Sequence, residues 1–203
     1  ITPVFVEQGK GLIGFVANRA HHANIGCDTP GSMPISSRLE EEGLIIPPTL
    51  LFKAGQLQQD ALSLLEIRGD SLNGDFAAQA GANKLGMQRL QELLTTMSTE
   101  DYEQGMDELN DYADRITANT IAELQVGEYS FTDYLDDDGC GQLSIRLALT
   151  LRIGPDHLEL DFRDSSKQVA GNLNCPESVV AAAAFYCVRC LLPGDPPACE
   201  GLF

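Results

Sequence analysis

"GQLSIRLALTLRI" (Gly141–Ile153) alternates apolar and polar side chains along most of its length. A period of two predicts a β-strand with one face toward a core. The same alternation occurs before it, in "GEYSFTDYLDDDG" (127–139), and after it, in "HLELDF" (157–162). Turn-forming residues at Asp136–Gly141 and Gly154–Asp156 separate the three runs. The sequence therefore predicts an antiparallel β-meander.

The segments before the meander have helical periodicity. A short helix is predicted over residues 57–65, and two long helices over 73–98 and 98–124. The second long helix has Ser98 or Thr99 as its N-cap, and acidic residues follow in its first turn, where the helix dipole favours them. Apolar residues recur at about helical spacing in the first long helix: Phe76, Ala80, Leu85, Leu90, Leu93 and Leu94.

One further helix is predicted after the meander, within "NCPESVVAAAAFYCVRCLL". Asn174 is the predicted N-cap, and Pro176 lies near the first turn. The "CVRC" motif (Cys187 to Cys190) has the spacing of redox and zinc sites. Inside an apolar helix, however, residues i and i+3 are simply neighbours. Buried, inert thiols are the preferred interpretation, because cysteine is among the most buried residue types.

The N-terminal part predicts a β-hairpin followed by a long loop. Two β-rich runs, Pro3–Val6 and Leu12–Ala17, flank the turn "EQGKG". The second run delivers the stretch from Asn18 to His22 at its end, where functional residues are often found. Residues 27–56 are rich in Gly, Pro and Ser, but they include apolar residues that favour an ordered, packed loop.

These elements indicate the α+β class: hairpin and ordered loop, central helical pair, antiparallel meander and C-terminal helix. We expect three regions in one larger chain: 1–56 with the hairpin and site loop, 57–125 with the helices, and 126–203 with the meander and final helix. The chain begins with Ile1 rather than Met and stops within a loop-like stretch. We therefore interpret it as a piece of a longer protein.

Composition excludes several classes of protein. The net charge of −17 argues against nucleic-acid binding, which needs clustered Lys and Arg, and disfavours anionic membrane surfaces. The sequence has no apolar run of transmembrane length. Its six cysteines are interpreted as reduced thiols, which predicts a cytoplasmic protein.

His21 and His22 are the first candidates for chemistry. Neutral imidazole is the commonest metal ligand and a frequent general base. Adjacent residues of an extended segment point to opposite sides, so we do not expect both rings to bind one ion. One ring can act as a ligand while its neighbour packs or supports it. The alternative is a structural histidine that is satisfied by backbone carbonyl groups, and both interpretations stay open on spacing alone.

Cys27 and Asp28 follow the histidines in the same loop. "DTPG" (28–31) is turn chemistry, in which Asp28 bonds the backbone and Gly31 tolerates a positive φ. Partial exposure beside histidines would allow Cys27 to act as a thiolate nucleophile or metal ligand. A role in the turn is the preferred interpretation for Asp28.

Two further polar segments could carry chemistry. "DFRDSS" (161–166) and "GNLN" (171–174) join a strand end to a helix start, which makes Asn172 and Asn174 candidates for a substrate or anion site. Capping alone would also explain Asn174. "DDDG" (136–139) lacks the spaced ligands of a calcium loop and is better interpreted as a charged hairpin turn. The sequence contains no P-loop and no dinucleotide fingerprint.

Taken together, three stretches resemble the hydantoinase B/5-oxoprolinase family, which includes subunits of acetone and acetophenone carboxylases. They are "GFVANRAHHANIGCDTPGSMP", "EEGLIIPPTLLFKAGQL" and "ANKLGMQRLQELL", and "DFRDSSKQVAGNLNCPESVVAAAAFYCVRCLL" resembles the family's next block. The likeness covers nearly the whole chain in order. Two positions depart from the usual "HHADIGG": Asn24 replaces Asp, and Cys27 replaces Gly. "DFRDSS" also departs from the usual "DFTGSS" type.

The resemblance implies an ATP-dependent enzyme that opens cyclic amides such as hydantoins or 5-oxoproline. It implies a second, hydantoinase A-type subunit that binds ATP and Mg²⁺, which agrees with the missing P-loop. It also implies a divalent metal site (Zn, Mn or Fe) to which His22, or second His21, contributes. Asn24, Cys27 and Asp28 would then lie around the ligands, and an aspartate and a His–Asp pair upstream of Ile1 would complete the site.

The resemblance thus implies a subunit of an N-methylhydantoinase or 5-oxoprolinase type of hydrolase, inactive as this piece alone. A ketone carboxylase subunit and a non-catalytic assembly subunit are the alternatives. A homo-oligomer is also expected.

Overall fold

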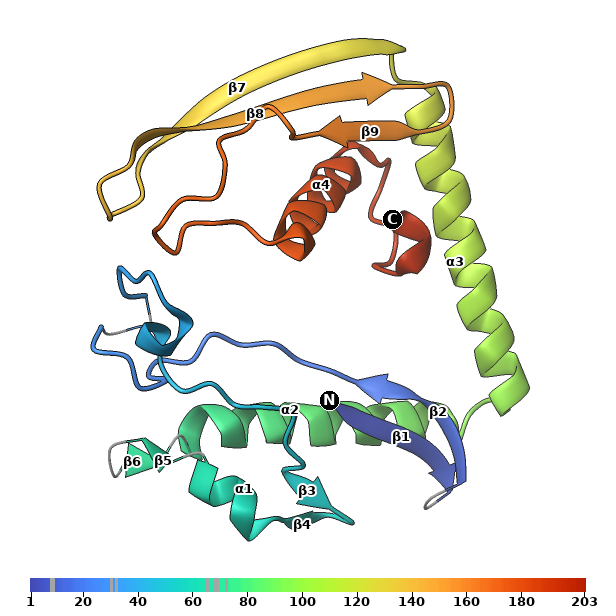
Figure 1. Cartoon of the computed structure of the whole chain (residues 1–203). Helices are drawn as coiled ribbons and strands as arrows, with labels where there is room; N and C mark the ends of the chain where they lie inside the picture. Colours follow the sequence, from blue (N-terminus) through green and yellow to red (C-terminus); the bar gives the residue numbers. More distant parts are fainter. Residues whose placement is uncertain (8–9, 30, 32, 65, 68–69, 72) are drawn as a thin grey trace. The chain divides into compact units, whose positions relative to one another are not determined.

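The structure is a computed structural model that describes residues 1–7, 10–29, 31, 33–64, 66–67, 70–71 and 73–203. It combines helices with small antiparallel sheets, so the predicted α+β class is confirmed (Figure 1). The chain forms two compact units, Ile1–Thr99 and Glu100–Phe203. Their boundary falls at the start of the second long helix of the predicted helical region. Each unit is described by itself below.

Unit 1 begins with the predicted hairpin. β1 (Thr2–Glu7) pairs antiparallel with β2 (Lys10–Val16), and the register shifts between Val4 and Phe5. The residues 8–9 of the predicted turn lie outside the described part. Val4 is fully buried, which gives the hairpin one face toward a core.

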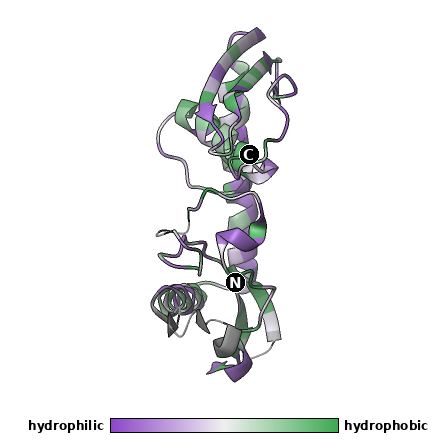
Figure 2. Ribbon diagram, turned by 60° about the vertical axis from the view of Figure 1, so that its left-hand side comes forward, coloured by the Kyte–Doolittle hydropathy of each residue, from purple (hydrophilic) through white to green (hydrophobic). Residues whose placement is uncertain are grey.

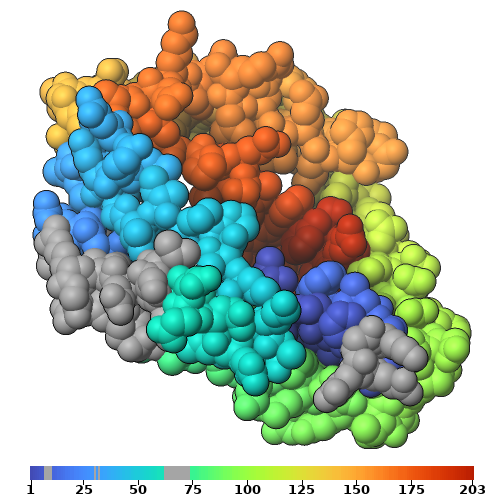
Figure 3. Space-filling view, turned by 60° about the horizontal axis from the view of Figure 1, so that its bottom comes forward, coloured from blue at the N-terminus to red at the C-terminus, as the bar shows by residue number. Residues whose placement is uncertain are grey.

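The hairpin packs on α2 (Asn73–Leu93), the first long helix, and Figure 3 shows the hairpin in dark blue beside the green helix. The approach is close at Gly86. A Cβ atom at this position would lie 2.8 Å from Cγ1 of Val16, nearer than side chains tolerate. Valine has a stiff χ1 and cannot easily move aside. Gly86 therefore allows the contact between helix and hairpin.

The segment between the hairpin and α2 is largely irregular, as predicted. It holds a 3-10 turn η2 (Leu39–Glu42), the strand pairs β3 (Phe52–Lys53) with β4 (Gln56–Leu57) and β5 (Glu66–Ile67) with β6 (Asp70–Ser71), and α1 (Gln59–Leu64). The backbone N–H of Leu44 donates to the carbonyl of Ile25 over 2.7 Å, which ties the loop together. The expected packing is present, because apolar side chains of this unit pack against one core cluster: Ile25, Ile46, Leu51 and Phe76.

Unit 2 contains α3 (Thr99–Ala122) and the predicted meander of β7 (Gly127–Asp137), β8 (Leu143–Ile153) and β9 (Leu158–Asp161). The strand order is β7-β8-β9, with antiparallel pairing throughout. Figure 2 shows polar and apolar residues alternating along these strands. α4 (Glu177–Leu191) and η3 (Glu200–Leu202) follow, and Ala113, Leu192 and Leu202 form a buried cluster between the helical elements.

Two predictions about α4 were wrong. The N-cap is Pro176 rather than Asn174, because the amide of Asn174 is engaged by the loop before the helix. Cys187 and Cys190 are exposed instead of buried. An apolar composition predicts burial only if something covers the helix, and no residue of α4 is fully buried by the described part of the chain. All six cysteines are free thiols.

Many large apolar side chains are exposed. Large side chains such as Phe131 and Tyr186 are 68% and 69% exposed. They lie on faces that the described residues leave open. Within those residues, the helices are too short or too polar to cross a membrane.

Candidate functional site

The histidine pair lies in the extended coil that follows β2 in unit 1. The two rings have different surroundings, as expected for neighbours in an extended segment: His21 is exposed, whereas the side chain of His22 is only 11% exposed. The ring of His22 packs edge-on against Phe76 of α2, with 4.6 Å between the ring centroids. Of the two histidines, the structure therefore holds only His22 in a fixed position.

A polar stripe on α2 faces this coil. Asp75, Gln79 and Asn83 are four residues apart and so share one face of the helix. The side chain of Asn18 donates to the backbone carbonyl of Gln79 over 2.8 Å and to Oδ1 of Asn83 over 2.7 Å. Asn83 in turn donates to Oγ1 of Thr2 in β1 over 3.2 Å. These bonds fix the coil to the helix just before the histidines.

The two ring nitrogens of His22 differ in their contacts. Nε2 lies 3.0 Å from Oε1 of Gln79. Nδ1 is buried without a hydrogen-bond partner, and Oδ2 of Asp75 is 3.9 Å away from it. The same carboxylate oxygen accepts the backbone N–H of Ala23 over 3.0 Å, which holds it beside the ring. Within the described residues, Nη1 of Arg189 is the other such buried atom. Buried polar atoms without a partner are uncommon and call for an explanation.

The residues predicted to surround the ligands form local turns. Oδ1 of Asn24 accepts the N–H of Gly26 over 2.8 Å, a bond that Asp would also make. The sulfur of Cys27 lies 3.0 Å from the carbonyl of Thr29, where a protonated thiol is the donor. Asp28 is exposed, and Gly31 has the positive φ of 74° expected for the turn. Pro30 lies outside the described residues. Asn24, which stands where the family usually has Asp, therefore keeps the backbone contact of that position.

These residues fit a divalent metal ion only in part. Among the described residues, no group of three or more His, Cys, Asp or Glu side chains is close enough to bind one. The coil and α2 do offer two donors of suitable chemistry, the unpaired Nδ1 of His22 and the nearby carboxylate of Asp75. The arrangement fits part of a metal site and needs further ligands.

Unit 2 holds a buried carboxylate of a different kind. Asp138, at the turn between β7 and β8, is 2% exposed. Its oxygens accept backbone N–H groups from Cys140 at 2.8 Å, Gln142 at 2.9 Å and Gly171 at 3.3 Å. Burial raises the pKa of Asp138, but these bonds together lower it more, so that the pKa lies below its ordinary value. The "DDDG" segment is a structural turn, as preferred from the sequence.

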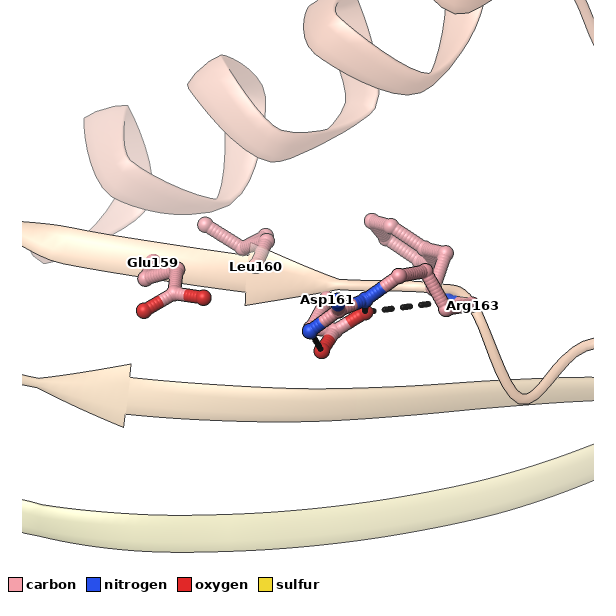
Figure 4. A pocket seen from close by; sticks show the side chains of 5 residues that line it. Glu159, Leu160, Asp161 and Arg163 are labelled. Atoms are coloured by element: carbon pink, nitrogen blue, oxygen red, sulfur yellow. Dashed lines mark hydrogen bonds and ion pairs between the residues drawn. The ribbon is translucent and has the colours of Figure 1, made fainter.

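A pocket in unit 2 is lined by Glu159–Arg163 (Figure 4). Within it, Asp161 accepts from Nε and Nη2 of Arg163 over 2.9 and 2.6 Å. Arg163 holds the pKa of Asp161 well below its ordinary value. Arg152 approaches Asp161 and pairs with Glu128 and Glu159, each over 2.8 Å. Two arginines therefore face three carboxylates, which disfavours an anionic ligand here.

The structure does not bring Asn172 and Asn174 together into an open site. The amide of Asn174 closes its own loop by bonds with Val169 and Gly171 between 2.8 and 2.9 Å. Asn172 is exposed. The anion site predicted for this pair stays a prediction without a geometric argument.

Comparison with known proteins identifies the family. The hydantoinase B/oxoprolinase family model matches residues 1–203. The chain belongs to this family.

Relatives of the hydantoinase B/oxoprolinase family cover the chain almost completely. A 5-oxoprolinase from Arabidopsis thaliana is 35% identical over 99% of the chain, which is 18% of that protein. The beta subunit of a caprolactamase from Pseudomonas jessenii is 31% identical over 99% of the chain, which is 35% of that relative. The crystal structure of the ATP-dependent caprolactamase from the same species matches 88% of the chain and 31% of its own chain at 28% identity, with a TM-score of 0.77. The chain thus spans less than two thirds of each of these relatives.

Sequence reasoning about this member of the hydantoinase B family missed the α2 stripe. The apolar periodicity of α2 predicts the helix, but it does not point to the polar residues between the apolar ones. The signal was present as Asp75, Gln79 and Asn83 at a spacing of four, with Phe76 beside the first of them. Only the structure shows that the coil after β2 lies against this stripe.

Proposed function

We propose that this chain is part of the B-type subunit of an ATP-dependent enzyme that hydrolyses a cyclic amide. The observation that carries the proposal is the family match along all 203 residues. Relatives named as a 5-oxoprolinase, a hydantoinase and a caprolactamase support it, because each of these names denotes the opening of a cyclic amide. The hydantoinase and caprolactamase relatives are each named as one subunit of an enzyme, which supports a partner subunit of the hydantoinase A type.

Within that enzyme, we propose that His22 contributes one ligand to a divalent metal ion. Its Nδ1 atom is buried and unpaired, and the carboxylate of Asp75 is close enough to be a second donor after a small movement. The remaining ligands would come from elsewhere in the full-length protein. A bound metal would act as a Lewis acid toward a carbonyl group or a water molecule.

The residues of this chain would then hold the donor and restrict its motion. Phe76 packs against the ring and limits access of water to it. Asp75 fixes the backbone at Ala23, next to His22. Activation of the amide oxygen by phosphorylation is assigned to the ATP-binding partner, since the sequence of this chain has no phosphate-binding loop.

The first experiment tests the reaction. The full-length protein would be co-purified with its A-type partner, and ATP hydrolysis would be measured with hydantoin, 5-oxoproline or caprolactam present. Hydrolysis of ATP that depends on one of these amides, with release of the opened product, would support the proposal. Bicarbonate-dependent turnover of a ketone would instead identify a carboxylase. Assembly with the partner without any turnover would identify a non-catalytic subunit.

The second experiment tests the metal ligand. Metal content of the full-length complex would be compared between wild type and His22→Ala, with His157→Ala as the control. His157 is exposed in the turn between β8 and β9, where it pairs with Asp156. We expect loss of metal in His22→Ala alone. Loss in His21→Ala with retention in His22→Ala would move the assignment to the neighbouring ring. A cytoplasmic location and a homo-oligomeric state stay predictions.

A further inference from the structure

Three side-chain amides connect β1, the coil after β2 and α2 to the ring of His22. We call Asn83, Asn18 and Gln79 the amide chain. Asn83 donates to Thr2, Asn18 donates to Asn83, and Nε2 of Gln79 donates to Oδ1 of Asn18 over 2.9 Å. The amide chain ends with Oε1 of Gln79, which lies 3.0 Å from Nε2 of His22. Each amide therefore has its oxygen and nitrogen matched to a neighbour.

One backbone carbonyl fixes the orientation of the whole amide chain. An amide can be turned over to exchange its oxygen and nitrogen, so its orientation has to be argued from its partners. The carbonyl oxygen of Gln79 can only accept, and the Asn18 atom 2.8 Å away must therefore be the nitrogen. Oδ1 of Asn18 then faces the side chain of Gln79, which must present its own nitrogen there. Oε1 of Gln79 is consequently the atom that faces His22.

The same logic sets the proton on the imidazole ring. Because Oε1 of Gln79 has no hydrogen to donate, Nε2 of His22 must carry one. A neutral histidine with hydrogen on Nε2 has its electron pair on Nδ1. Nδ1 is the buried, unpaired atom that lies 3.9 Å from Asp75. Nδ1 of His22 can therefore donate its electron pair to a ligand.

We propose that Gln79 and Asn18 are positioning residues that hold His22 as the Nε2–H tautomer and so direct the Nδ1 electron pair toward the site. The tautomer needs this support because Asp75 lies on the Nδ1 side of the ring. Its carboxylate is a stronger acceptor than an amide oxygen, and without Gln79 it would attract a hydrogen on Nδ1. That hydrogen would remove the electron pair. The effect of this arrangement on a metal rests on the function proposed above, whereas the tautomer itself does not.

Nitrogen NMR of the full-length complex, labelled with ¹⁵N-histidine, tests the tautomer directly. Spectra would be recorded above the titration range of histidine, and His22→Ala would identify the signals. We expect a pyridine-like Nδ1 and a protonated Nε2 in the wild type without added metal. A protonated Nδ1 in the wild type would overturn the proposal, whatever the behaviour of the variants.

Variants of Gln79 test the cause. Gln79→Met keeps the length of the side chain but removes the acceptor, and we expect a substantial Nδ1–H population. Gln79→Glu loses the donor to Oδ1 of Asn18 but restores an acceptor toward Nε2 of His22, and should therefore restore the Nε2–H form. Gln91→Met is the matched control, because Gln91 lies on the same helix and bonds the carbonyl of Phe5 in β1 over 3.1 Å. An unchanged tautomer in Gln79→Met, or the same shift in Gln91→Met, would overturn the assignment.

Metal titration separates this inference from the proposed function. Loss of a group that orients a metal-bound histidine typically lowers affinity by about 10- to 100-fold. We expect a loss of this size for Zn²⁺ or Mn²⁺ in Gln79→Met and recovery in Gln79→Glu. A tautomer shift without any loss of affinity would uphold the positioning role and overturn the metal-binding role of His22.

Discussion

His22 in unit 1 and Asp138 in unit 2 both lie in polar segments that follow a β-strand, but they differ in how fully they are bonded. The carboxylate of Asp138 accepts three backbone N–H groups. His22 has one nitrogen bonded and the other buried without a partner. A polar group with all its bonds made contributes to the fold, whereas an unmade buried bond costs about 1–3 kcal/mol. Of the two, His22 is therefore the residue that is available to a ligand, through its Nδ1 atom.

The largest expected effect concerns activity at His22. Its replacement by Ala should lower amide-dependent ATP hydrolysis of the full-length complex by about 100-fold or more, since loss of groups that merely orient ligands reaches that size. The unfolding temperature should also fall somewhat, because the substitution removes the packing of the ring against Phe76 and the bond to Gln79, although Nδ1 itself makes no bond in the fold. A large loss of stability with retained turnover would contradict the distinction between the two residues.

The second effect concerns stability at Asp138. In Asp138→Asn, an N–H₂ group would face a backbone N–H that a carboxylate oxygen accepts in the wild type. We expect a clearly lower unfolding temperature of the full-length protein by calorimetry. Asp137→Asn is the matched control, because Asp137 is exposed and accepts one N–H, from Gly139. Equal effects of the two substitutions would show that burial of Asp138 adds nothing.

The pH dependence follows from two carboxylates of unit 2. The pKa values of Asp138 and Asp161 are lowered in the folded state. The unfolded chain then binds more protons than the folded chain as the pH falls through the ordinary carboxyl range. The stabilisation is complete above that range and is lost as the pH drops toward the lowered values. Thermal unfolding measured from neutral to acidic pH should show this loss, and Asp138→Asn should reduce its slope.

A smaller effect is expected at the contact between α2 and β2. Gly86→Ala should destabilise the protein by about 1–3 kcal/mol, as overpacking usually does. Gly81 lies on the same helix, and a Cβ atom there would have no atom within 4 Å beyond the nearby backbone of the helix itself. Gly81→Ala should instead stabilise by about 0.5–1 kcal/mol, because Ala favours helices. Denaturant unfolding of both variants would test the contact, and an equal gain in both would refute it.

The smallest effect is expected at the surface of α2. Arg89 and Glu92 form a 2.7 Å ion pair, and their side chains are 71% and 62% exposed. Arg89→Ala should change stability by about 0.5 kcal/mol or less, since solvent screens such pairs. The same unfolding measurement supplies a baseline for the other α2 variants. A larger change would mean that the pair supports the polar stripe of the helix.

The sequence predicted regular elements well and contacts between elements poorly. Alternation in 141–153 and the apolar spacing of α2 are local properties, so they predict strands and helices directly. The N-cap of α4 was misplaced because Asn174 bonds Val169 and Gly171, a choice between two local partners that composition cannot make. The partner of His22 is 57 residues away, at Gln79, and no periodicity of the coil specifies it.

Gly86 also has a consequence for the accuracy of the site. It lies seven residues after Gln79 on the same helix. This is about 10 Å along the helix axis, at a rise of about 1.5 Å per residue. A hydrogen-bonded helix is stiff in that direction, so any sliding imposed at Val16 carries Gln79 with it by nearly the same amount. Gly86, which has no side chain, thus influences the position of an imidazole that contacts the helix two turns away. A mutational screen confined to polar side chains would therefore miss a position that affects where Gln79 lies relative to His22.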